Sequence, residues 1–136
     1  MSYFTLKIID SRKQLVVENV SSFVGEDGSG SFGILPDHTR MMTVLTFGLA
    51  SFRRGEGDWE YVAVPGAVLY FDANVLNLVC RHYLIDSEYE RIAQRLVEEL
   101  VAEEEQIREV RQSLKSMEEA LLKRMWELRR QGVSLL

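Results

Sequence analysis

The feature that most constrains the fold is a change in hydrophobic periodicity at Asp86. From Ser87 to Gln131, a run of 45 residues, the chain has no glycine or proline. Its apolar residues there recur at steps of three and four, the spacing of one helix face. Before Asp86, short apolar runs alternate with turn residues, and eight of the nine glycines and both prolines lie in this part. The chain therefore divides into a β-rich part and a helical part.

Aromatic and β-branched runs predict a series of short strands in residues 1–85. The runs cover residues 3–9, 15–24, 41–46, 49–53, 59–64, 67–71 and 75–85. The second run is long, and we expect it to bend near Glu18 and Asn19. Turn signals at intervals of about eight to twelve residues favour a β-sandwich or a barrel. The bulky candidates for its core are Phe4, Phe23, Phe32, Phe47, Trp59, Tyr61 and Tyr70.

The helical part is compatible with two arrangements, because its apolar stripe is interrupted at residues 103–105, which are all glutamate. One is a hairpin of helices near 87–102 and 106–131, and the other is a single extended rod. Residues 86–105 carry a net charge of −6 and residues 106–136 one of +3, which favours the hairpin. Exposed ion pairs contribute only about 0–1 kcal/mol each, so the apolar stripe dominates. We expect Asp86 or Ser87 as N-cap and Gly132 as C-cap.

The predicted fold class is a β-sandwich N-terminal domain, residues 1–85, followed by an α-helical C-terminal domain, residues 86–136, as a hairpin or an extended helix pair. The net charge of −5 argues against a nucleic-acid-binding protein, which usually carries a basic face. The single cysteine, Cys80, excludes an internal disulfide and suggests a reducing compartment. We expect no signal peptide and no membrane-spanning segment, because no apolar stretch approaches about 20 residues.

Residues with catalytic or metal-binding potential are few. The histidines are His38 and His82, and only Cys80 could join them in a metal site. Zinc ligands normally come in pairs at fixed spacings, so we expect no metal ion. A strand would place Cys80 and His82 on one face, but no acid–base pair accompanies them. The Gly55-Glu56-Gly57 turn is flanked by acids and opens no helix, so it predicts a hairpin rather than a phosphate site. We therefore expect no catalytic residue and no cofactor.

The most distinctive stretch is residues 30–38, Gly-Ser-Phe-Gly-Ile-Leu-Pro-Asp-His. A polar, glycine-rich turn precedes it, and Phe32, Ile34 and Leu35 form a short apolar strand. Pro36 ends this strand because proline has no N–H to donate to a neighbouring strand. Asp37 and His38 then follow in a loop that would expose them to solvent. This arrangement suits a contact surface rather than a catalytic site.

Residues 30–38 resemble the Gly-x-Leu/Phe-Gly-Ile-x-Pro-x-His signature of the epsilon subunit of F-type ATP synthases. Further matches to this family are Gly48-Leu49, the run Gly-Ala-Val-Leu at residues 66–69, and Asn74-Val75. Their order and spacing agree over residues 3–85, and the charged helical tail has the family's length. The spelling differs from that of the commonest members, which suggests a divergent branch.

The resemblance implies a set of partner contacts. In this family the sandwich lies at the foot of the rotor, against the gamma subunit and the ring of membrane c subunits. The turn that meets the c-ring corresponds here to Gly30, Ser31 and Phe32. The gamma contact corresponds to Asp37, His38, Thr39 and Arg40. The basic second half of the tail matches a region that approaches an acidic segment of the beta subunit, and its carriers here are Lys123, Arg124, Arg129 and Arg130.

Some relatives bind ATP through an Ile/Leu-Asp-x-x-Arg-Ala motif at the start of the first tail helix. Ile85 and Asp86 match this motif, but Tyr89 stands where the arginine is expected. Arg91 comes two residues later, about 200° around a helix. Ile85, Asp86 and Arg91 are the candidates for such a site, and we do not expect it to be complete.

The sequence therefore favours a noncatalytic central-stalk subunit that couples gamma and the c-ring to the alpha/beta head. Its C-terminal helices would restrain ATP hydrolysis. The resemblance implies that it lies at the cytoplasmic face of the cell membrane and associates with the membrane only through the complex. An alternative from another class is a free-standing β-sandwich and coiled-coil adaptor protein. A third is a small β-sandwich enzyme that uses His38 or His82.

Overall fold

A computed structural model describes residues 2–130 and residue 132. The chain forms two compact units, Met1–Val101 and Ala102–Leu136. The first contains the strands and the first helical turns, and the second contains a long helix. The strands are β1 (Phe4–Ile9), β2 (Gln14–Asp27), β3 (Gly30–Ile34), β4 (Met41–Leu45), β5 (Gly48–Arg54), β6 (Trp59–Val64), β7 (Ala67–Asp72), β8 (Val75–Cys80) and β9 (Leu84–Asp86).

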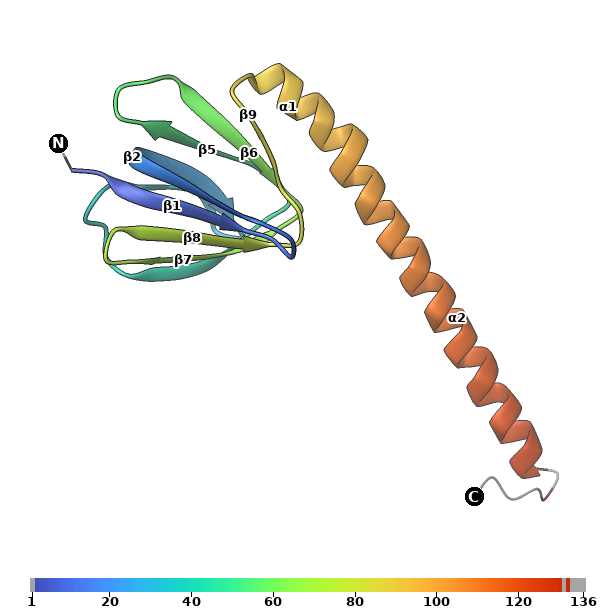
Figure 1. Ribbon diagram of the computed structural model, residues 1–136. Helices are drawn as coiled ribbons and strands as arrows, with labels where there is room; N and C mark the ends of the chain where they lie inside the picture. The colour runs from blue at the N-terminus through green and yellow to red at the C-terminus, as the bar shows by residue number, and fades with distance from the viewer. Residues whose placement is uncertain (1, 131, 133–136) are drawn as a thin grey trace. The chain divides into compact units, whose positions relative to one another are not determined.

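The strands form a two-layered sandwich, as predicted. Along the hydrogen-bonded path the order is β1-β8-β7-β4-β2-β5-β6-β9, with β3 paired to β2 and a further pairing between β1 and β2. Figure 1 shows β1, β8 and β7 side by side in one layer, with β2, β5 and β6 in the other. The β1–β8 pair is parallel, and the other strand pairs in the described residues are antiparallel.

Strand β2 belongs to both layers because it bends at Asn19. Its first half pairs with β1, and its second half pairs with β5 and β3. Asn19 has a positive φ of 61°, a conformation that asparagine tolerates better than most residues. The Asn19 carbonyl accepts a hydrogen bond from the Gly55 N–H at 3.1 Å, which ties the bend to the β5–β6 turn. The predicted bend near Glu18 and Asn19 is therefore confirmed.

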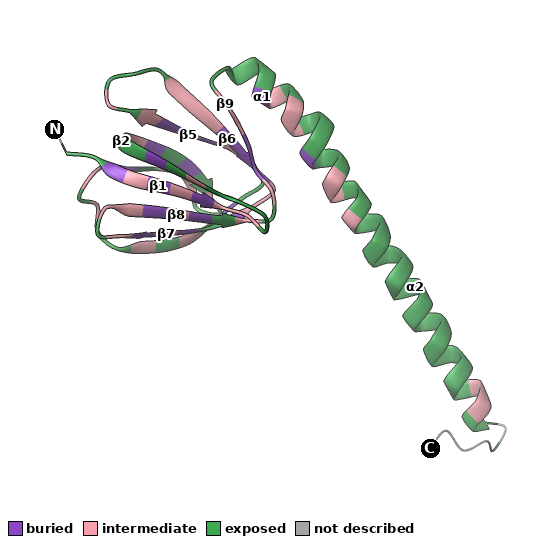
Figure 2. Cartoon of the chain, in the orientation of Figure 1, coloured by how far each residue is buried: buried purple, intermediate pink, exposed green. Residues whose placement is uncertain are grey.

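The core lies between the two layers and is apolar throughout (Figure 2). Of the seven aromatic residues predicted to fill it, only Phe4 and Phe23 are buried, while Phe47 is exposed. The other fully buried aromatic side chains in the described residues are Phe52 and Phe71. The largest fully buried aliphatic side chains of the sandwich are Leu6, Ile8, Ile34, Leu69, Leu76 and Leu78.

The predicted strand over residues 75–85 is two strands that lie in different layers. Strand β8 ends at Cys80, where it pairs with β7, and β9 begins at Leu84 and pairs with β6. The intervening residues carry the chain from one layer to the other. His82 therefore lies outside the strand, and the expectation that it shares a strand face with Cys80 is wrong.

The first unit continues into helix α1 (Tyr89–Arg95) and a π-helical segment η1 (Leu96–Val101). Ile92 and Leu100 are fully buried and pack against Ala63 and Leu84. Helix α1 begins later than expected, with Glu88 as its N-cap residue. Asp86, one of the two predicted N-caps, belongs to β9, where its backbone pairs with Tyr61.

The second unit is helix α2 (Ala102–Arg130), which has no buried residue in its described length. Glu103, Glu104 and Glu105 form its first turn. Of the two arrangements that the sequence left open, the described residues therefore have the one without a turn at these glutamates. Gly132 has a φ of +80° and donates its N–H to the Arg129 carbonyl at 3.1 Å, as expected of a C-cap. Gln131, the predicted last helical residue, lies outside the described residues.

Candidate functional site

The predicted c-ring contact lies on the hairpin between β2 and β3. Asp27 pairs with Gly30 across the turn residues Gly28 and Ser29. Gly30 has a φ of +123°, which a residue with a side chain adopts only with strain. The local sequence therefore sets a tight turn at this tip, as the glycine-rich run predicted.

The Asp27 carboxylate fixes the shape of this turn. Its Oδ1 atom accepts hydrogen bonds from the Ser29 N–H at 2.9 Å and the Ser29 hydroxyl at 2.5 Å. Its Oδ2 atom accepts one from the Thr43 hydroxyl of β4 at 2.8 Å. These bonds, with that of the Ser29 side chain foremost, lower the pKa of Asp27. The carboxylate stays ionised at neutral pH and holds the turn against β4.

The side chains on the hairpin differ in exposure. Ser31 is exposed, whereas Phe32 is half-buried and packs against the core. The Phe32 ring lies so close to Gly25 that a Cβ atom at Gly25 would come within 3.2 Å of it. Ser31 therefore offers the more accessible of the two side chains, and Phe32 mainly supports the turn.

The predicted gamma contact is the loop of residues 37–40, and it is anchored to the β7–β8 turn. The Asp37 N–H donates to Asn74 Oδ1 at 2.7 Å, and Asn74 Nδ2 donates to Asp37 Oδ1 at 2.8 Å. Arg40 forms an ion pair with Asp72 at 3.5 Å. Asp37, Thr39 and Arg40 are exposed, so this loop is a fixed and accessible surface.

His38 is less accessible than the sequence suggested. It is half-buried, and the edge of its ring meets the Phe71 ring at a centroid distance of 5.8 Å and an interplanar angle of 85°. Its Nδ1 atom lies 2.7 Å from the Thr39 carbonyl, which identifies Nδ1 as the protonated nitrogen in the neutral ring. The expectation that the loop exposes His38 fully is wrong, because Phe71 attracts the ring toward the core.

An uncovered apolar face joins these two regions, and the sequence analysis missed it. It consists of Met42 and Val44 on β4, Val68 on β7 and Val79 on β8, with exposed fractions of 68%, 63%, 43% and 48%. Val44 pairs with Val68, and Val68 pairs with Val79, so these side chains lie side by side on one face. We call these four residues the β4–β7–β8 face.

The β4–β7–β8 face lies between the two predicted contact regions. Met41, at the start of β4, follows the 37–40 loop directly, and Leu45, at its end, pairs with Asp27 of the hairpin. Four strand residues rise about 13 Å. The loop, the apolar face and the hairpin turn therefore form one continuous surface. A signal existed in the sequence: Met41-Met42, Val44-Leu45, Val68-Leu69 and Leu78-Val79 are apolar on both faces of their strands, a pattern of strands covered on both sides.

The four basic residues predicted to meet the beta subunit lie at the end of α2. All four, Lys123, Arg124, Arg129 and Arg130, are exposed. Arg124 pairs with Glu127 at 3.8 Å, and Arg130 lies over the Trp126 ring at 4.9 Å. At about 100° per residue, these residues are spread over about 240° of the helix circumference. They form a basic helix end rather than one basic stripe.

The candidates for an ATP site occupy the junction of β9 and α1. Arg91 donates to both carboxylate oxygens of Asp86, at 2.5 Å and 2.7 Å, and the Glu88 N–H donates to Asp86 Oδ1 at 3.0 Å. The Asp86 side chain is only 7% exposed. These interactions, with that of Arg91 foremost, hold the pKa of Asp86 well below its usual range. Ile85 is half-buried and packs against the core.

The structure therefore brings Asp86 and Arg91 together, but as partners of each other. A ring contact between Tyr61 of β6 and Tyr89 of α1, at 5.5 Å and 73°, lies beside them. Both interactions fasten the first turn of α1 to the sandwich. The position of the motif's arginine is filled by an aromatic residue that packs on a strand.

The remaining reactive groups show no catalytic arrangement. Burial raises the pKa of the Cys80 thiol to about 11, so the thiol stays protonated at neutral pH. The Cys80 thiol lies 3.7 Å from the Ile9 carbonyl. In the described part of the chain, no group of three or more histidine, cysteine or acidic residues is placed to hold a metal ion. None of the described helices is both long and apolar enough to cross a membrane.

The fold and these surfaces define a class of protein, a β-sandwich with an amphipathic helical extension that offers contact surfaces rather than a reaction centre. Residues 3–84 match the family model described as ATP synthase, Delta/Epsilon chain, beta-sandwich domain. The chain belongs to this family, and it resembles the epsilon rather than the delta naming in its curated relatives.

Two of these relatives are ATP synthase epsilon chain 2 of Cereibacter sphaeroides and the ATP synthase epsilon chain of Psychrobacter arcticus. The first is 33% identical over 95 residues, and the match covers 69% of this chain and 65% of the relative. The second is 22% identical over 125 residues, and the match covers 89% of this chain and 91% of the relative. The family predicted from residues 30–38 is therefore confirmed.

Solved structures share the fold. A chain in the Euglena gracilis mitochondrial ATP synthase structure of OSCP, F1 and c-ring matches with a TM-score of 0.58 at 15% identity, over 72% of this chain and 64% of that chain. A chain in the Tetrahymena thermophila mitochondrial ATP synthase structure of central stalk and c-ring matches with a TM-score of 0.52 at 12% identity, over 62% of this chain and 69% of that chain.

Proposed function

We propose that this chain is a noncatalytic epsilon subunit in the central stalk of an F-type ATP synthase. In this role the sandwich joins the gamma subunit to the c-ring, and the tail approaches the alpha/beta head. The family and the names of the curated relatives support the subunit. The observation that carries the contact surface is the β4–β7–β8 face, because strands rarely leave such a cluster uncovered unless a partner covers it.

The gamma subunit is the partner that we assign to the β4–β7–β8 face. The predicted gamma contacts Asp37, His38, Thr39 and Arg40 adjoin this face at the start of β4. An interface of this kind has an apolar centre and a polar rim. Met42, Val44, Val68 and Val79 would form the centre, and the charged loop would form part of the rim.

The c-ring is the partner that we assign to the hairpin tip. Gly30 sets the turn, Ser31 offers an exposed hydroxyl, and Phe32 supports the strand from below. The Asp27 carboxylate holds the tip on β4, so the turn can transmit force without bending. Torque transfer requires such a rigid contact, and the role of this chain is therefore mechanical.

The tail is the element that we propose to restrain ATP hydrolysis. Lys123, Arg124, Arg129 and Arg130 give the end of α2 a basic character that suits an acidic segment of the beta subunit. Because Arg91 is occupied by Asp86, we propose that Ile85, Asp86 and Arg91 do not bind ATP and that the tail acts without a bound nucleotide. The chain would lie at the cytoplasmic face of the cell membrane as a peripheral part of the complex.

Co-purification with gamma tests the assignment. We expect Val68→Lys to weaken the binding of this chain to purified gamma about tenfold or more, because it places a charge at the centre of an apolar interface. The matched control is Val24→Lys, which changes an exposed strand valine on β2, in the other layer. Equal binding of gamma by the parent and the Val68→Lys variant would refute the assignment.

A further inference from the structure

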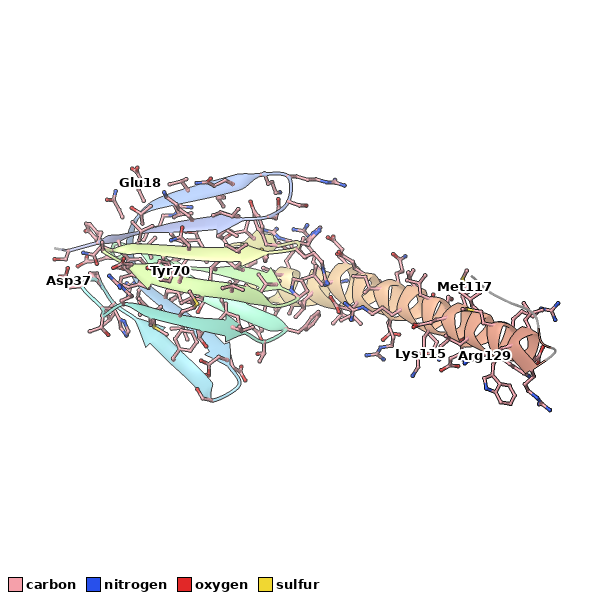
Figure 3. The ribbon with its side chains drawn as sticks, turned by 90° about the horizontal axis from the view of Figure 1, so that it is seen from below. Glu18, Asp37, Tyr70, Lys115, Met117 and Arg129 are labelled. Carbon is pink, nitrogen blue, oxygen red and sulfur yellow. The ribbon has the colours of Figure 1, made fainter. Side chains whose placement is uncertain are left out.

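Helix α2 carries an apolar stripe that no described part of the chain covers. The stripe consists of Ile107, Val110, Leu114, Met117 and Leu121, at alternating steps of three and four. Val110, Leu114, Met117 and Leu121 are each more than half exposed. Figure 3 shows that Met117 lies on the opposite side of α2 from Lys115. This spacing is that of a helix that packs against a second helix.

Two charged residues border the stripe on one side and select a partner. Arg111 and Glu118 are seven residues apart, so they lie above one another on the helix surface, next to the apolar stripe. Neither has an ion-pair partner in the described part of the chain. One helix thus offers a positive and a negative charge at a spacing that an identical helix of opposite direction can match.

We propose that α2 pairs with α2 of a second copy of this chain in an antiparallel, two-fold symmetric arrangement centred between Lys115 and Ser116. In this register Leu114 packs against the partner's Met117, and Val110 packs against the partner's Leu121. Arg111 then lies opposite the partner's Glu118, and symmetry forms the same ion pair a second time. This dimer concerns the chain outside the ATP synthase and goes beyond its proposed role there.

The flanking charges favour this register over its neighbours. A shift of one heptad in one direction places Arg111 opposite the partner's Arg111 and Glu104 opposite the partner's Glu118. A shift in the other direction places Glu118 opposite the partner's Glu118. Like charges across a helix interface are unfavourable and act against wrong partners. Only the central register combines apolar layers with opposite charges and brings no like charges together.

A parallel pair is disfavoured by Arg124. The alternating steps of the stripe continue from Leu121 to position 124, which is occupied by arginine. In a parallel, in-register pair, two Arg124 side chains would meet at the interface. In the antiparallel register Arg124 instead lies beside the partner's Ile107, and its aliphatic stem can cover that residue.

The interface is short, so the dimer should be weak and reversible. It contains the layers formed by Val110, Leu114, Met117 and Leu121 from both helices, with Ile107 at each end. Isolated helix pairs of this length bury less surface than stable dimers do. We therefore expect an equilibrium between monomer and dimer that depends on protein concentration.

Sedimentation velocity of the full chain over a range of concentrations tests the proposal. We expect a concentration-dependent dimer for the parent and an about tenfold weaker dimer for Arg111→Glu, which turns two attractive contacts into two repulsive ones. The double variant Arg111→Glu, Glu118→Arg should restore the parent affinity. Rescue is specific to the antiparallel register, because these two residues do not face each other in a parallel pair.

The matched control is Lys115→Glu, which changes net charge as Arg111→Glu does but lies on the opposite side of α2 from Met117 (Figure 3). It should leave the dimer unchanged. The proposal is overturned if the parent remains monomeric at every concentration, as it would if α2 folded back on its own chain. It is also overturned if the double variant is as weak as the single variant, or if Lys115→Glu weakens the dimer equally.

Discussion

Asp37 and Asn74 hold each other through two reciprocal hydrogen bonds, although they are 37 residues apart in the chain. Both have left-handed backbone conformations, with φ of 65° and 58°. The Asn74 carbonyl also accepts a hydrogen bond from the Thr5 N–H at 3.0 Å. A single asparagine thus connects the 37–40 loop, the β7–β8 turn and the start of β1.

Replacing Asn74 with alanine should lower the free energy of unfolding by about 2–3 kcal/mol. The change removes two hydrogen bonds, each worth about 1 kcal/mol, and adds the strain of alanine at positive φ. Asn74→Gly keeps the conformation accessible and loses only the side chain. Urea unfolding should therefore rank the parent above Asn74→Gly, and Asn74→Gly above Asn74→Ala. An Asn74→Ala variant as stable as the parent would contradict this role.

The ion pair of Asp86 and Arg91 should make stability depend on pH. The pKa of Asp86 is lowered in the folded protein, chiefly by Arg91, so the stabilisation is fully present above its ordinary value of 3.8 and is lost as the pH falls below it. Arg91→Ala should therefore be less stable than the parent at pH 7, and the difference should shrink in acid.

Urea titrations of the parent and Arg91→Ala at pH 7 and pH 3 measure this difference. The matched control is Arg95→Ala, which removes an exposed pair with Glu99 on the same helix and should cost little. A deficit of Arg91→Ala that stays constant with pH would show that the arginine acts through packing rather than through the Asp86 charge.

The Cys80 thiol should react slowly with alkylating reagents in the folded protein. Its pKa rises from 9.0 to about 11 through burial, which lowers the reactive thiolate population near pH 8 about a hundredfold. Iodoacetamide labelling followed by mass spectrometry compares the folded chain with the chain in urea. Equal rates in the two states would mean that Cys80 is accessible and ionises as a free thiol does.

The sandwich was predictable to the extent that local patterns define it. The bend of β2 at Asn19 and the glycine turn before Phe32 are encoded in a few adjacent residues, and both were predicted. The separation of β8 from β9 was not, because residues 75–85 read as one apolar run and only the pairing of Leu84 with Ala63 places β9 in the other layer. Long-range pairing of this kind leaves no periodic signal.

The candidate site was predictable only in part, for a related reason. The family signature indicated the hairpin at Gly30 and the loop at His38, but it gave no reason to expect that Phe71 draws the imidazole ring inward. The β4–β7–β8 face was missed because Val44, Val68 and Val79 look like ordinary core residues. Their exposure depends on which sheet face is covered, and this is decided by the packing of the two layers.

The boundary of the independently folding part is the next prediction. We predicted that residues 1–85 fold alone, whereas the compact unit extends to Val101. Ile92 and Leu100 are fully buried against Ala63 and Leu84, and each buried side chain of this size contributes about 1.5–3 kcal/mol. A chain ending at Ile85 should unfold cooperatively but be about 3–6 kcal/mol less stable than one ending at Val101.

Thermal unfolding of the two truncated chains distinguishes these cases. If the shorter chain shows no cooperative transition, then α1 and η1 belong to the minimal folding unit, and the predicted boundary at residue 85 is wrong. Ile92→Ala in the longer chain serves as a control, because it should account for about half of the difference between the two chains.

The last prediction concerns α2 as a restraint on ATP hydrolysis. Reversing Lys123, Arg124, Arg129 and Arg130 to glutamate should release any inhibition while leaving gamma binding intact, because these residues lie far along the chain from the β4–β7–β8 face. Attraction between a basic helix end and an acidic partner should also weaken with salt, since the Debye length falls from about 10 Å at 0.1 M to about 3 Å at 1 M. Serine substitutions at Val110, Leu114, Met117 and Leu121 should change the rate less predictably, because the apolar stripe can pack against more than one partner. The measurement is the ATPase rate of the reconstituted head with the parent, the charge-reversed chain and a chain that ends at Val101. Faster hydrolysis with both altered chains supports the restraint, and equal rates for all three would mean that α2 serves assembly alone.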